Sequence, residues 1–221
     1  MNYPEVTFVL EKGKDRKAPL ILVNGFQEER KKLIEKIRKR TGKDFSLLFF
    51  SGMDWNGDLT PYPAKSPFKR GEDFPGKGKD YLDFLLEKRN TVLKENDIVP
   101  SYHVIAGYSL AGLFALYSMI AGESFDAAVS ASGSLWYPGF EDFIQKAELE
   151  GKRTIYLSLG DKEKETRNPA MKTVEEKTLA IAKMLKEKGQ KVFVESNSGN
   201  HFQDPEGRLA KGIAWILENR K

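Results

Sequence analysis

The chain has 221 residues, of which 40% are hydrophobic, enough for one sizeable core and in keeping with a single domain over residues 1–221. It contains no cysteine, which excludes disulfides and thiolate metal sites, and we expect no bound metal. The net charge is +4, but the 36 basic and 32 acidic side chains are interleaved rather than gathered in a basic stripe, so no nucleic-acid partner is expected.

The N-terminal stretch, MNYPEVTFVLEKGKD, lacks the basic start and long apolar core of a signal peptide. No run of residues in the chain approaches the apolar length of a membrane span. We therefore expect a cytoplasmic protein with no membrane partner. Within this stretch, residues 6–10 form a first apolar run of strand length, VTFVL.

Strand-like and helix-like segments alternate from residue 19 to the last helix. Apolar runs of strand length occupy residues 19–23, 45–50, 102–106, 125–130, 153–159 and 191–195. Helical periodicity or uninterrupted apolar character marks residues 27–41, 80–96, 110–121, 140–149, 169–189 and the segment from 205 onward. This order predicts an α/β fold with a mostly parallel central sheet, helices on both faces and right-handed crossovers.

Residues 51–79 break this periodicity. The segment is rich in glycine and proline and carries the aromatic residues Trp55, Tyr62, Phe68 and Phe74. A loop of this length inside a compact domain is uncommon and is often functional. The aromatic residues argue against a free linker, and we expect the loop to form a wall of the active site.

The most informative stretch is Ser101–Gly122, SYHVIAGYSLAGLFALYSMIAG. A short strand leads into the turn GYSLAG, and a wholly apolar helix follows. This is close to the Gly-x-Ser-x-Gly pattern of a nucleophile elbow, with Ala111 in the fifth place. Such a turn needs small neighbours because strand and helix approach closely, and alanine is small enough. Ser109 is therefore the candidate nucleophile; the alternative is a tight turn in which Ser109 only caps the helix.

A serine hydroxyl is hardly ionised at neutral pH and needs a base within hydrogen-bond reach. The chain has two histidines. His103 lies within the strand that leads to the elbow, where we expect a core or sheet-edge role. His201 follows the last strand after a short polar loop and precedes a helix, which is where this architecture holds its base. His201 is therefore the predicted base.

Three carboxylates after the sixth predicted strand compete for the role of the acid that orients this base: Asp161, Glu163 and Glu165. We prefer Glu163, three residues past Gly160, because it is far enough around the turn to bend back toward His201. Asp161 directly follows the glycine and is the alternative acid, although it is also placed to brace the loop. All three would be surface charges if the histidine works without an acid.

The oxyanion of an acyl-transfer intermediate needs preorganised donors, most simply backbone N–H groups. We expect one from Leu110, directly after the nucleophile, and one from Phe26, in the loop after the strand at 19–23. Gly25 would give this loop its sharp bend. The alternative for Asn24-Gly25 is an ordinary turn.

Aromatic side chains fall in predicted loops near these residues. Trp55, Trp136 and Tyr137 are candidates for substrate binding, as is Phe202 beside the histidine. The alternative is that these large side chains belong to the core. Arg167 favours an anionic substrate, on proximity in sequence alone.

Taken together, the segments GYSLAGLFALY, SGSLWY, GDKE and GNHF resemble the α/β-hydrolase superfamily. Within it they are similar to the esterase family that includes esterase D-like and trilactone-cleaving enterochelin esterase-like enzymes. The resemblance covers most of the chain, from PLILVNGF to the last helix. It implies ester hydrolysis through an acyl-enzyme, with Ser109 as nucleophile, His201 as base and then acid, and Glu163 or Asp161 as orienter. It implies no cofactor or metal.

Two positions depart from the family pattern: Ala111 replaces the usual second glycine, and Asn24 stands where many relatives have histidine. We predict a serine esterase of the α/β-hydrolase fold that acts on a small-molecule ester. The nearest alternatives are a thioesterase or an amidase or peptidase on the same triad, because leaving-group choice depends on pocket shape. A non-catalytic binding module on a hydrolase scaffold is the alternative from another class. The substrate and the oligomeric state are not predicted.

Overall fold

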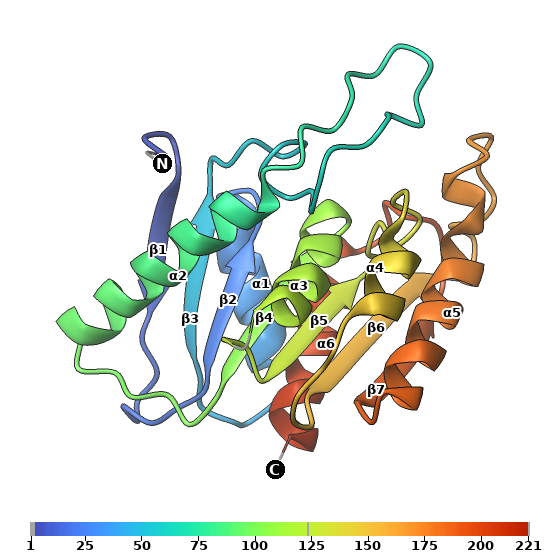
Figure 1. The fold of residues 1–221 in the computed structure, drawn as a ribbon. Coiled ribbons are helices and arrows are strands. Elements are labelled where there is room, and N and C mark those ends of the chain that lie inside the picture. Colours follow the sequence, from blue (N-terminus) through green and yellow to red (C-terminus); the bar gives the residue numbers. More distant parts are fainter. Residues whose placement is uncertain (1–2, 123, 221) are drawn as a thin grey trace.

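The computed structural model describes residues 3–122 and 124–220 (Figure 1). Its strands are β1 (Thr7–Glu11), β2 (Leu20–Asn24), β3 (Ser46–Ser51), β4 (His103–Tyr108), β5 (Ala127–Ala131), β6 (Thr154–Gly160) and β7 (Lys191–Asn197). Its helices are α1 (Glu29–Arg38), α2 (Gly78–Glu95), α3 (Leu110–Ala121), α4 (Phe140–Lys146), α5 (Val174–Glu187) and α6 (Pro205–Asn219), with a short 3-10 turn at Met171–Thr173. The strands and helices predicted from the sequence are all present, with shifted ends.

Within the described residues, the strands form a seven-stranded sheet in the order β1-β3-β2-β4-β5-β6-β7. Strand β1 pairs antiparallel with β3, and the pairings from β3 through to β7 are parallel. The predicted mostly parallel sheet is therefore confirmed. Because parallel strands end at the same edge, the loops after β2, β4, β6 and β7 gather there.

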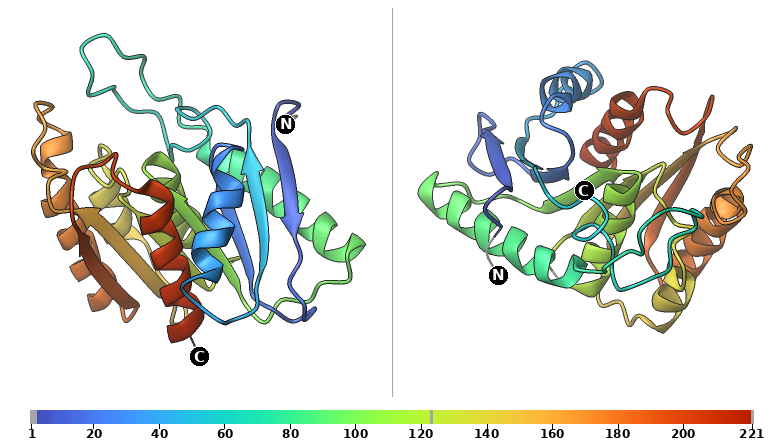
Figure 2. Two further views of the ribbon diagram at one scale, coloured as in Figure 1. Left: turned by 180° about the vertical axis from the view of Figure 1, so that it is seen from behind. Right: turned by 90° about the horizontal axis from the view of Figure 1, so that it is seen from above.

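Alternate residues of each strand point to opposite faces of the sheet and build two hydrophobic cores. In β2, Leu20 and Leu22 join the core beneath α2 to α5, whereas Ile21 and Val23 join the core beneath α1 and α6. Figures 1 and 2 show these layers, with α1 and α6 side by side on the face opposite to α3. The inner strands β2 to β6 are mostly apolar and buried because both faces of the sheet are covered there, whereas the edge strands β1 and β7 are partly exposed.

Helix α3 is buried along almost its whole length, from Leu110 to Ile120. It packs against β4 and β5. A helix that is apolar on every face has no side that favours water, so its composition predicts this position. The burial of α3 fixes the turn that precedes it, and with it the position of Ser109.

Several helix ends differ from the prediction: α1 spans Glu29–Arg38 rather than 27–41, and α5 begins at Val174 rather than at 169. Helix α2 begins at Gly78, so Asp80 lies in its first turn rather than capping it. A carboxylate in the first turn still favours the helix through the macrodipole. Helix α4 ends at Lys146 because Ala147 is extended, with φ −65° and ψ 130°.

The segment 51–79 projects beyond the sheet as a long loop (Figure 1). It is held by hydrogen bonds to two other segments: Tyr62 Oη donates to Pro138 O at 3.0 Å, and Asn168 Nδ2 donates to Pro67 O at 3.0 Å. The loop is thus tied to the segments that precede α4 and α5.

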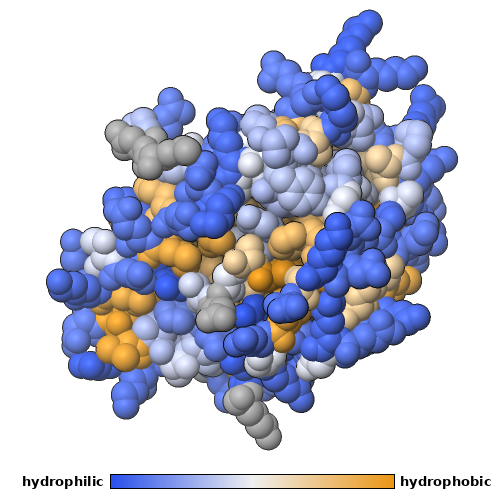
Figure 3. Space-filling view, in the orientation of Figure 1, coloured by the Kyte–Doolittle hydropathy of each residue, from blue (hydrophilic) through white to orange (hydrophobic). Residues whose placement is uncertain are grey.

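The face that carries α2 to α5 is largely hydrophilic, with hydrophobic patches between the charged side chains (Figure 3). This mixture is what amphipathic helices present to solvent. None of the helices in the described part of the chain is long and apolar enough to cross a membrane.

Candidate active site

Ser109 lies in the turn between β4 and α3, at the carboxyl edge of the sheet. Its backbone adopts φ 58° and ψ −123°, a region that residues with side chains rarely occupy. Gly107 makes this turn feasible, because a Cβ at that position would lie 2.1 Å from Ala111 O. With glycine there, the small methyl group of Ala111 fits, so alanine in the fifth place of the motif is compatible with an elbow.

His201 reaches the same point from the loop between β7 and α6. Its Nε2 lies 3.1 Å from Ser109 Oγ, and its Nδ1 lies 2.8 Å from Glu163 Oε2. An ionised carboxylate can only accept a hydrogen bond, so Nδ1 carries the proton and Nε2 is left to accept from the serine hydroxyl. The serine, the histidine and the carboxylate thus form one hydrogen-bonded chain across three loops.

Glu163 is buried, with 8% of its surface exposed. Its Oε1 accepts hydrogen bonds from Gly160 N at 2.6 Å, Ser132 Oγ at 2.7 Å and Arg208 Nη1 at 2.9 Å. Burial acts to raise the pKa of Glu163, but hydrogen bonds from His201, Ser132 and a backbone N–H outweigh it and hold this pKa below its usual value. The carboxylate is therefore ionised at neutral pH, the state that orients a histidine.

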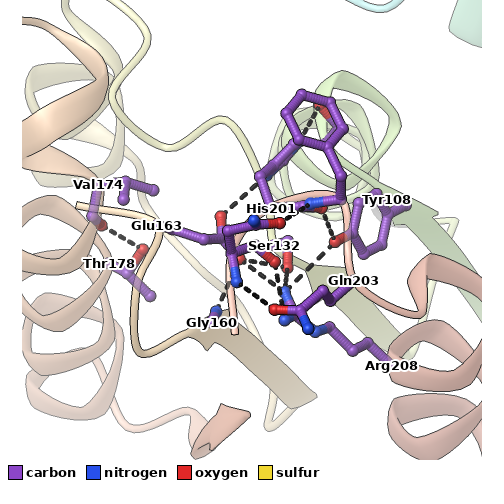
Figure 4. Close-up of polar contacts among 12 residues, drawn as sticks. Tyr108, Ser132, Gly160, Glu163, Val174, Thr178, His201, Gln203 and Arg208 are labelled. Carbon is purple, nitrogen blue, oxygen red and sulfur yellow. Dashed lines mark hydrogen bonds and ion pairs between the residues drawn. The ribbon is translucent and has the colours of Figure 1, made fainter. Parts of the chain in front are cut away.

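Two members of this network, Arg208 and Ser132, were not predicted from the sequence (Figure 4). Arg208 extends from α6, is 4% exposed, and donates from Nη2 to Ser198 O and Asn200 O, at 2.9 Å each. It therefore joins the acid to the loop that carries His201. A basic residue on the inward-facing side of the last helix was the signal available in the sequence, because a buried cation needs partners.

The competing carboxylates lie elsewhere. Asp161 is exposed, and its Oδ1 accepts a hydrogen bond from Gly199 N at 2.8 Å. It braces the loop, as the alternative interpretation of this residue proposed, and does not bond to the histidine. Glu165 is exposed as well. The structure therefore brings Glu163, and neither alternative acid, to His201.

His103 opens β4 and lies at the opposite end of that strand from Ser109. Burial, with a smaller contribution from the charge of Arg89, lowers the pKa of His103 to about 4. Its Nδ1 is buried without a hydrogen-bond partner among the described residues. His103 is thus a neutral structural histidine, as its place in the strand predicts.

A cleft of about 260 Å³ opens beside Ser109 and His201, between the starts of α1 and α6. Its walls are mainly apolar, formed by Val23, Phe26, Leu33, Phe49, Trp55, Phe202, Pro205 and Leu209. Phe26 and Trp55 stack with ring centroids 4.7 Å apart, and Phe202 is 83% exposed at the rim. Trp55 is the part of the loop 51–79 that lines the cleft. Its contact with substrate stays a prediction.

Three polar side chains also line the cleft: Asn24, Glu29 and Glu206. Asn24 is 2% exposed; its Oδ1 accepts from Tyr81 Oη at 2.8 Å, while its Nδ2 has no partner among the described residues. Glu206 pairs with Lys32 Nζ at 2.7 Å. The floor of the cleft therefore carries hydrogen-bonding groups beneath apolar walls.

The two predicted oxyanion donors differ in their present partners. Leu110 is the first residue of α3, so its N–H has no acceptor within the helix and is available beside Ser109. The N–H of Phe26 donates to Glu29 Oε2 at 3.1 Å. A substrate oxygen at Phe26 would have to replace this carboxylate. Both residues stay predicted donors.

Of the remaining candidates, Trp136 lines a small second cavity of about 20 Å³ with Glu163 and His201 and is outside the lining of the cleft. Tyr137 is 2% exposed, and its hydroxyl donates to Tyr62 O at 2.5 Å. The structure therefore corrects the prediction that Tyr137 binds substrate, because its ring belongs to the core beneath the loop 51–79. Arg167 is exposed and lies outside the lining of the cleft.

The described residues contain no group of three or more His, Asp and Glu side chains placed to hold a metal ion. The groups that do converge are a strained serine, an imidazole and an ionised carboxylate. This set activates a hydroxyl for attack on a carbonyl carbon.

Solved structures with this fold include several hydrolases. An IroE-like serine hydrolase from Shewanella oneidensis matches with a TM-score of 0.79 at 15% identity, covering 96% of this chain and 75% of that chain. The siderophore hydrolase EstB from Aspergillus nidulans matches with a TM-score of 0.74 at 17% identity, covering 100% and 97%. The enterobactin esterase FES from Shigella flexneri gives 0.71 at 17% identity, covering 96% and 55%. The chain has the α/β-hydrolase fold of these proteins.

One curated sequence, an uncharacterized protein of Bacillus subtilis (strain 168) called YbbA, is 31% identical over 137 residues. The match covers 60% of this chain, and the chain spans 55% of the length of that relative. No protein-family model matches the sequence.

Proposed function

We propose that the protein is a serine hydrolase that cleaves a carboxylic ester of a small molecule through an acyl-enzyme on Ser109. The main support is the hydrogen-bonded chain from Ser109 through His201 to Glu163, with distances of 3.1 Å and 2.8 Å. The strained backbone of the serine and the apolar cleft beside it add to this support, as does the fold shared with serine hydrolases.

In the first half of the reaction, Ser109 Oγ attacks the ester carbonyl carbon while His201 Nε2 takes the hydroxyl proton. Glu163 holds the imidazole in its required tautomer and stabilises the imidazolium that forms. The carbonyl oxygen becomes an oxyanion, for which the N–H groups of Leu110 and Phe26 are the proposed donors. His201 then protonates the leaving alcohol, and the acyl group remains on the serine.

In the second half, a water molecule gives a proton to His201 and attacks the acyl carbon, which releases the acid and restores Ser109. The stacked rings of Phe26 and Trp55 are the proposed contacts for an apolar part of the substrate. Trp136, beside His201 in the small second cavity, is a further proposed contact for the substrate.

Labelling with a fluorophosphonate probe tests this proposal. We expect the wild type and a His103→Ala variant to be labelled, and Ser109→Ala to lose the label completely. His201→Ala should label much more slowly, because the serine then lacks its base. A folded wild type that never labels would contradict the proposal and favour a non-catalytic binding module.

Thioester and amide cleavage would use the same groups. The rates measured with a panel of chromogenic short-chain esters, thioesters and peptides show which of these reactions is fastest. Siderophore esters belong in the panel because EstB and FES, which share the fold, are described as siderophore and enterobactin esterases. Acetylated sugars and feruloyl esters complete it. The cytoplasmic location expected from the sequence stays a prediction.

A further inference from the structure

Glu29 is a carboxylate in the cleft that the proposed mechanism does not use. It is the first residue of α1, it lines the cleft together with Ser109 and His201, and it is partly buried. Its Oε2 accepts the N–H of Phe26 at 3.1 Å. The negative charge therefore lies next to the position proposed for the carbonyl oxygen of a substrate.

The cations near Glu29 are committed to other carboxylates. Lys32 Nζ lies 2.7 Å from Glu206 Oε1, and Lys36 Nζ lies 3.8 Å from Glu206 Oε2 and also pairs with Asp204. Glu29 forms no ion pair with any residue in the described part of the chain. Burial raises the pKa of Glu29, and the neighbouring negative charge of Glu206 raises it further. A cation entering the cleft would offset the repulsion from Glu206 and favour the ionised form of Glu29.

Glu29 lies in the first turn of α1, where the helix macrodipole favours a carboxylate, and its hydrogen bond to the N–H of Phe26 holds the turn before the helix. Glutamine could make the same hydrogen bond, but only glutamate adds a negative charge to the cleft. A carboxylate facing an apolar cleft is more costly to bury than a neutral amide unless it gains a partner. A cationic group of a substrate in the cleft would supply such a partner.

We infer that Glu29 selects esters that carry a protonated amine next to the carbonyl group, and that α-aminoacyl esters are the substrate class. In such an ester, the ammonium group is attached to the carbon beside the carbonyl. A carbonyl oxygen that takes the N–H of Phe26 displaces Glu29 Oε2 and leaves the carboxylate facing this ammonium group. This inference rests on the proposed ester hydrolysis at Ser109.

Two other features of the cleft suit such a substrate. The stacked rings of Phe26 and Trp55 offer π faces to a cation. Asn24 Nδ2 is a buried donor without a partner among the described residues, so it can be satisfied by an ester oxygen but not by an ammonium group. The cleft thus has an acceptor for the amine and a donor for an oxygen.

The test compares two benzyl esters that differ in one group. Alanine benzyl ester carries an ammonium group where isobutyrate benzyl ester carries a methyl group of similar size. The value of kcat/KM is measured for both esters at a pH of about 6.5, below the ordinary α-amino pKa of about 7.7–8.0. The kcat/KM of the alanine ester is divided by that of the isobutyrate ester. The protonation state of His201 affects both esters equally and therefore cancels in this ratio.

We expect this ratio to fall about tenfold or more in Glu29→Gln, because the amide keeps the hydrogen bond to Phe26 but loses the charge that assists the ammonium contact. Glu28→Gln is the matched control: Glu28 is adjacent, exposed and outside the lining of the cleft, so its ratio should equal that of the wild type. Thermal unfolding of both variants checks that α1 is intact.

A ratio that is equal in the wild type and Glu29→Gln would overturn the inference, and Ser109-dependent hydrolysis of the isobutyrate ester would then leave the proposed function standing. If the wild type cleaves neither ester, the inference is tested by how strongly each ester protects Ser109 from labelling by the fluorophosphonate. Stronger protection by the alanine ester, lost in Glu29→Gln, supports the inference, and equal protection overturns it. A folded wild type without any labelling contradicts the inference and the proposed function together.

Discussion

The two oxygens of Glu163 face different partners. Oε2 meets the imidazole of His201, whereas Oε1 accepts from Arg208, Ser132 and Gly160 N–H. A carboxylate held by this many donors cannot rotate away from the histidine, so the hydrogen bonds to Oε1 fix the position of Oε2 beside the imidazole.

Substitutions of Glu163 and of its neighbour Asp161 should have different effects on kcat. We expect Glu163→Gln to lower kcat by about 10²–10⁴, because an amide no longer fixes the tautomer or stabilises the imidazolium. Asp161→Asn should leave kcat nearly unchanged, since Asp161 only accepts from Gly199 N. Steady-state hydrolysis of a chromogenic ester measures both. The reverse order of effects would assign the orienting role to Asp161.

Arg208 is a positioning residue that acts through Glu163. Arg208→Met breaks a buried ion pair, so we expect the free energy of unfolding to fall by about 3 kcal/mol, with a lower kcat. Arg208→Lys keeps the charge but cannot bond at once to Glu163 and to the carbonyl groups of Ser198 and Asn200, so it should recover only part of kcat. Urea unfolding and ester hydrolysis give the two values. Wild-type kcat in a folded Met variant would restrict Arg208 to a structural role.

At the scale of elements, the elbow depends on the close approach of β4 and α3. We expect Gly107→Ala to destabilise the fold by about 3 kcal/mol or more, because the new Cβ would lie 2.1 Å from Ala111 O and backbone atoms must move. Gly122→Ala at the other end of α3 is the control, since its Cβ meets Ser118 O at 3.7 Å and its backbone is extended. Equal melting temperatures for the two variants would contradict this account.

Elements with strong periodicity could be predicted from the sequence, and the ends of elements could not. The wholly apolar α3 and the apolar runs of the strands follow from burial on all sides, which composition records directly. The start of α2 was placed two residues late because Asp80 has the composition of a cap. A carboxylate in the first turn favours a helix as well, so composition alone does not separate the two positions.

The residues of the candidate site also divide into those that could be predicted from the sequence and those that could not. Ser109, His201 and Glu163 follow strand ends, and strand order brings such residues to one edge, so the sequence could predict them. Arg208 reaches Glu163 from α6, and its place on the inward-facing side of that helix indicates a buried cation but not its partner. Ser132 directly follows β5, and nothing in its local sequence shows that its hydroxyl donates to Glu163. Tyr137 was misassigned because an aromatic residue in a loop looks the same in the sequence whether it lines a cleft or fills a core.

The stability of the whole molecule should fall in acid, in two windows. The pKa of His103 is lowered from 6.5 to about 4 in the folded state, so between these values the unfolded chain binds the proton and the folded chain does not. Stability is therefore lost as the pH falls through this window, by about 3 kcal/mol in all. Glu163, whose folded pKa lies below its usual 4.5, adds a further loss at lower pH.

Urea unfolding between pH 7 and 4 tests the upper window. In the wild type, the free energy of unfolding should decrease steadily with falling pH. In His103→Gln this slope should be much smaller, whatever the absolute stability of the variant, because glutamine does not titrate. Parallel slopes in the two proteins would show that other groups cause the acid sensitivity.

The backbone of Ser109, at φ 58° and ψ −123°, lowers the stability of the fold while it positions the proposed nucleophile. Alanine normally makes a protein more stable than glycine does, but glycine adopts this conformation without cost, so we expect the order to reverse here. The Ser109→Gly variant should exceed Ser109→Ala in unfolding free energy by about 1 kcal/mol. Neither variant can attack a carbonyl group. Selection for stability alone would therefore replace the serine that the proposed reaction requires.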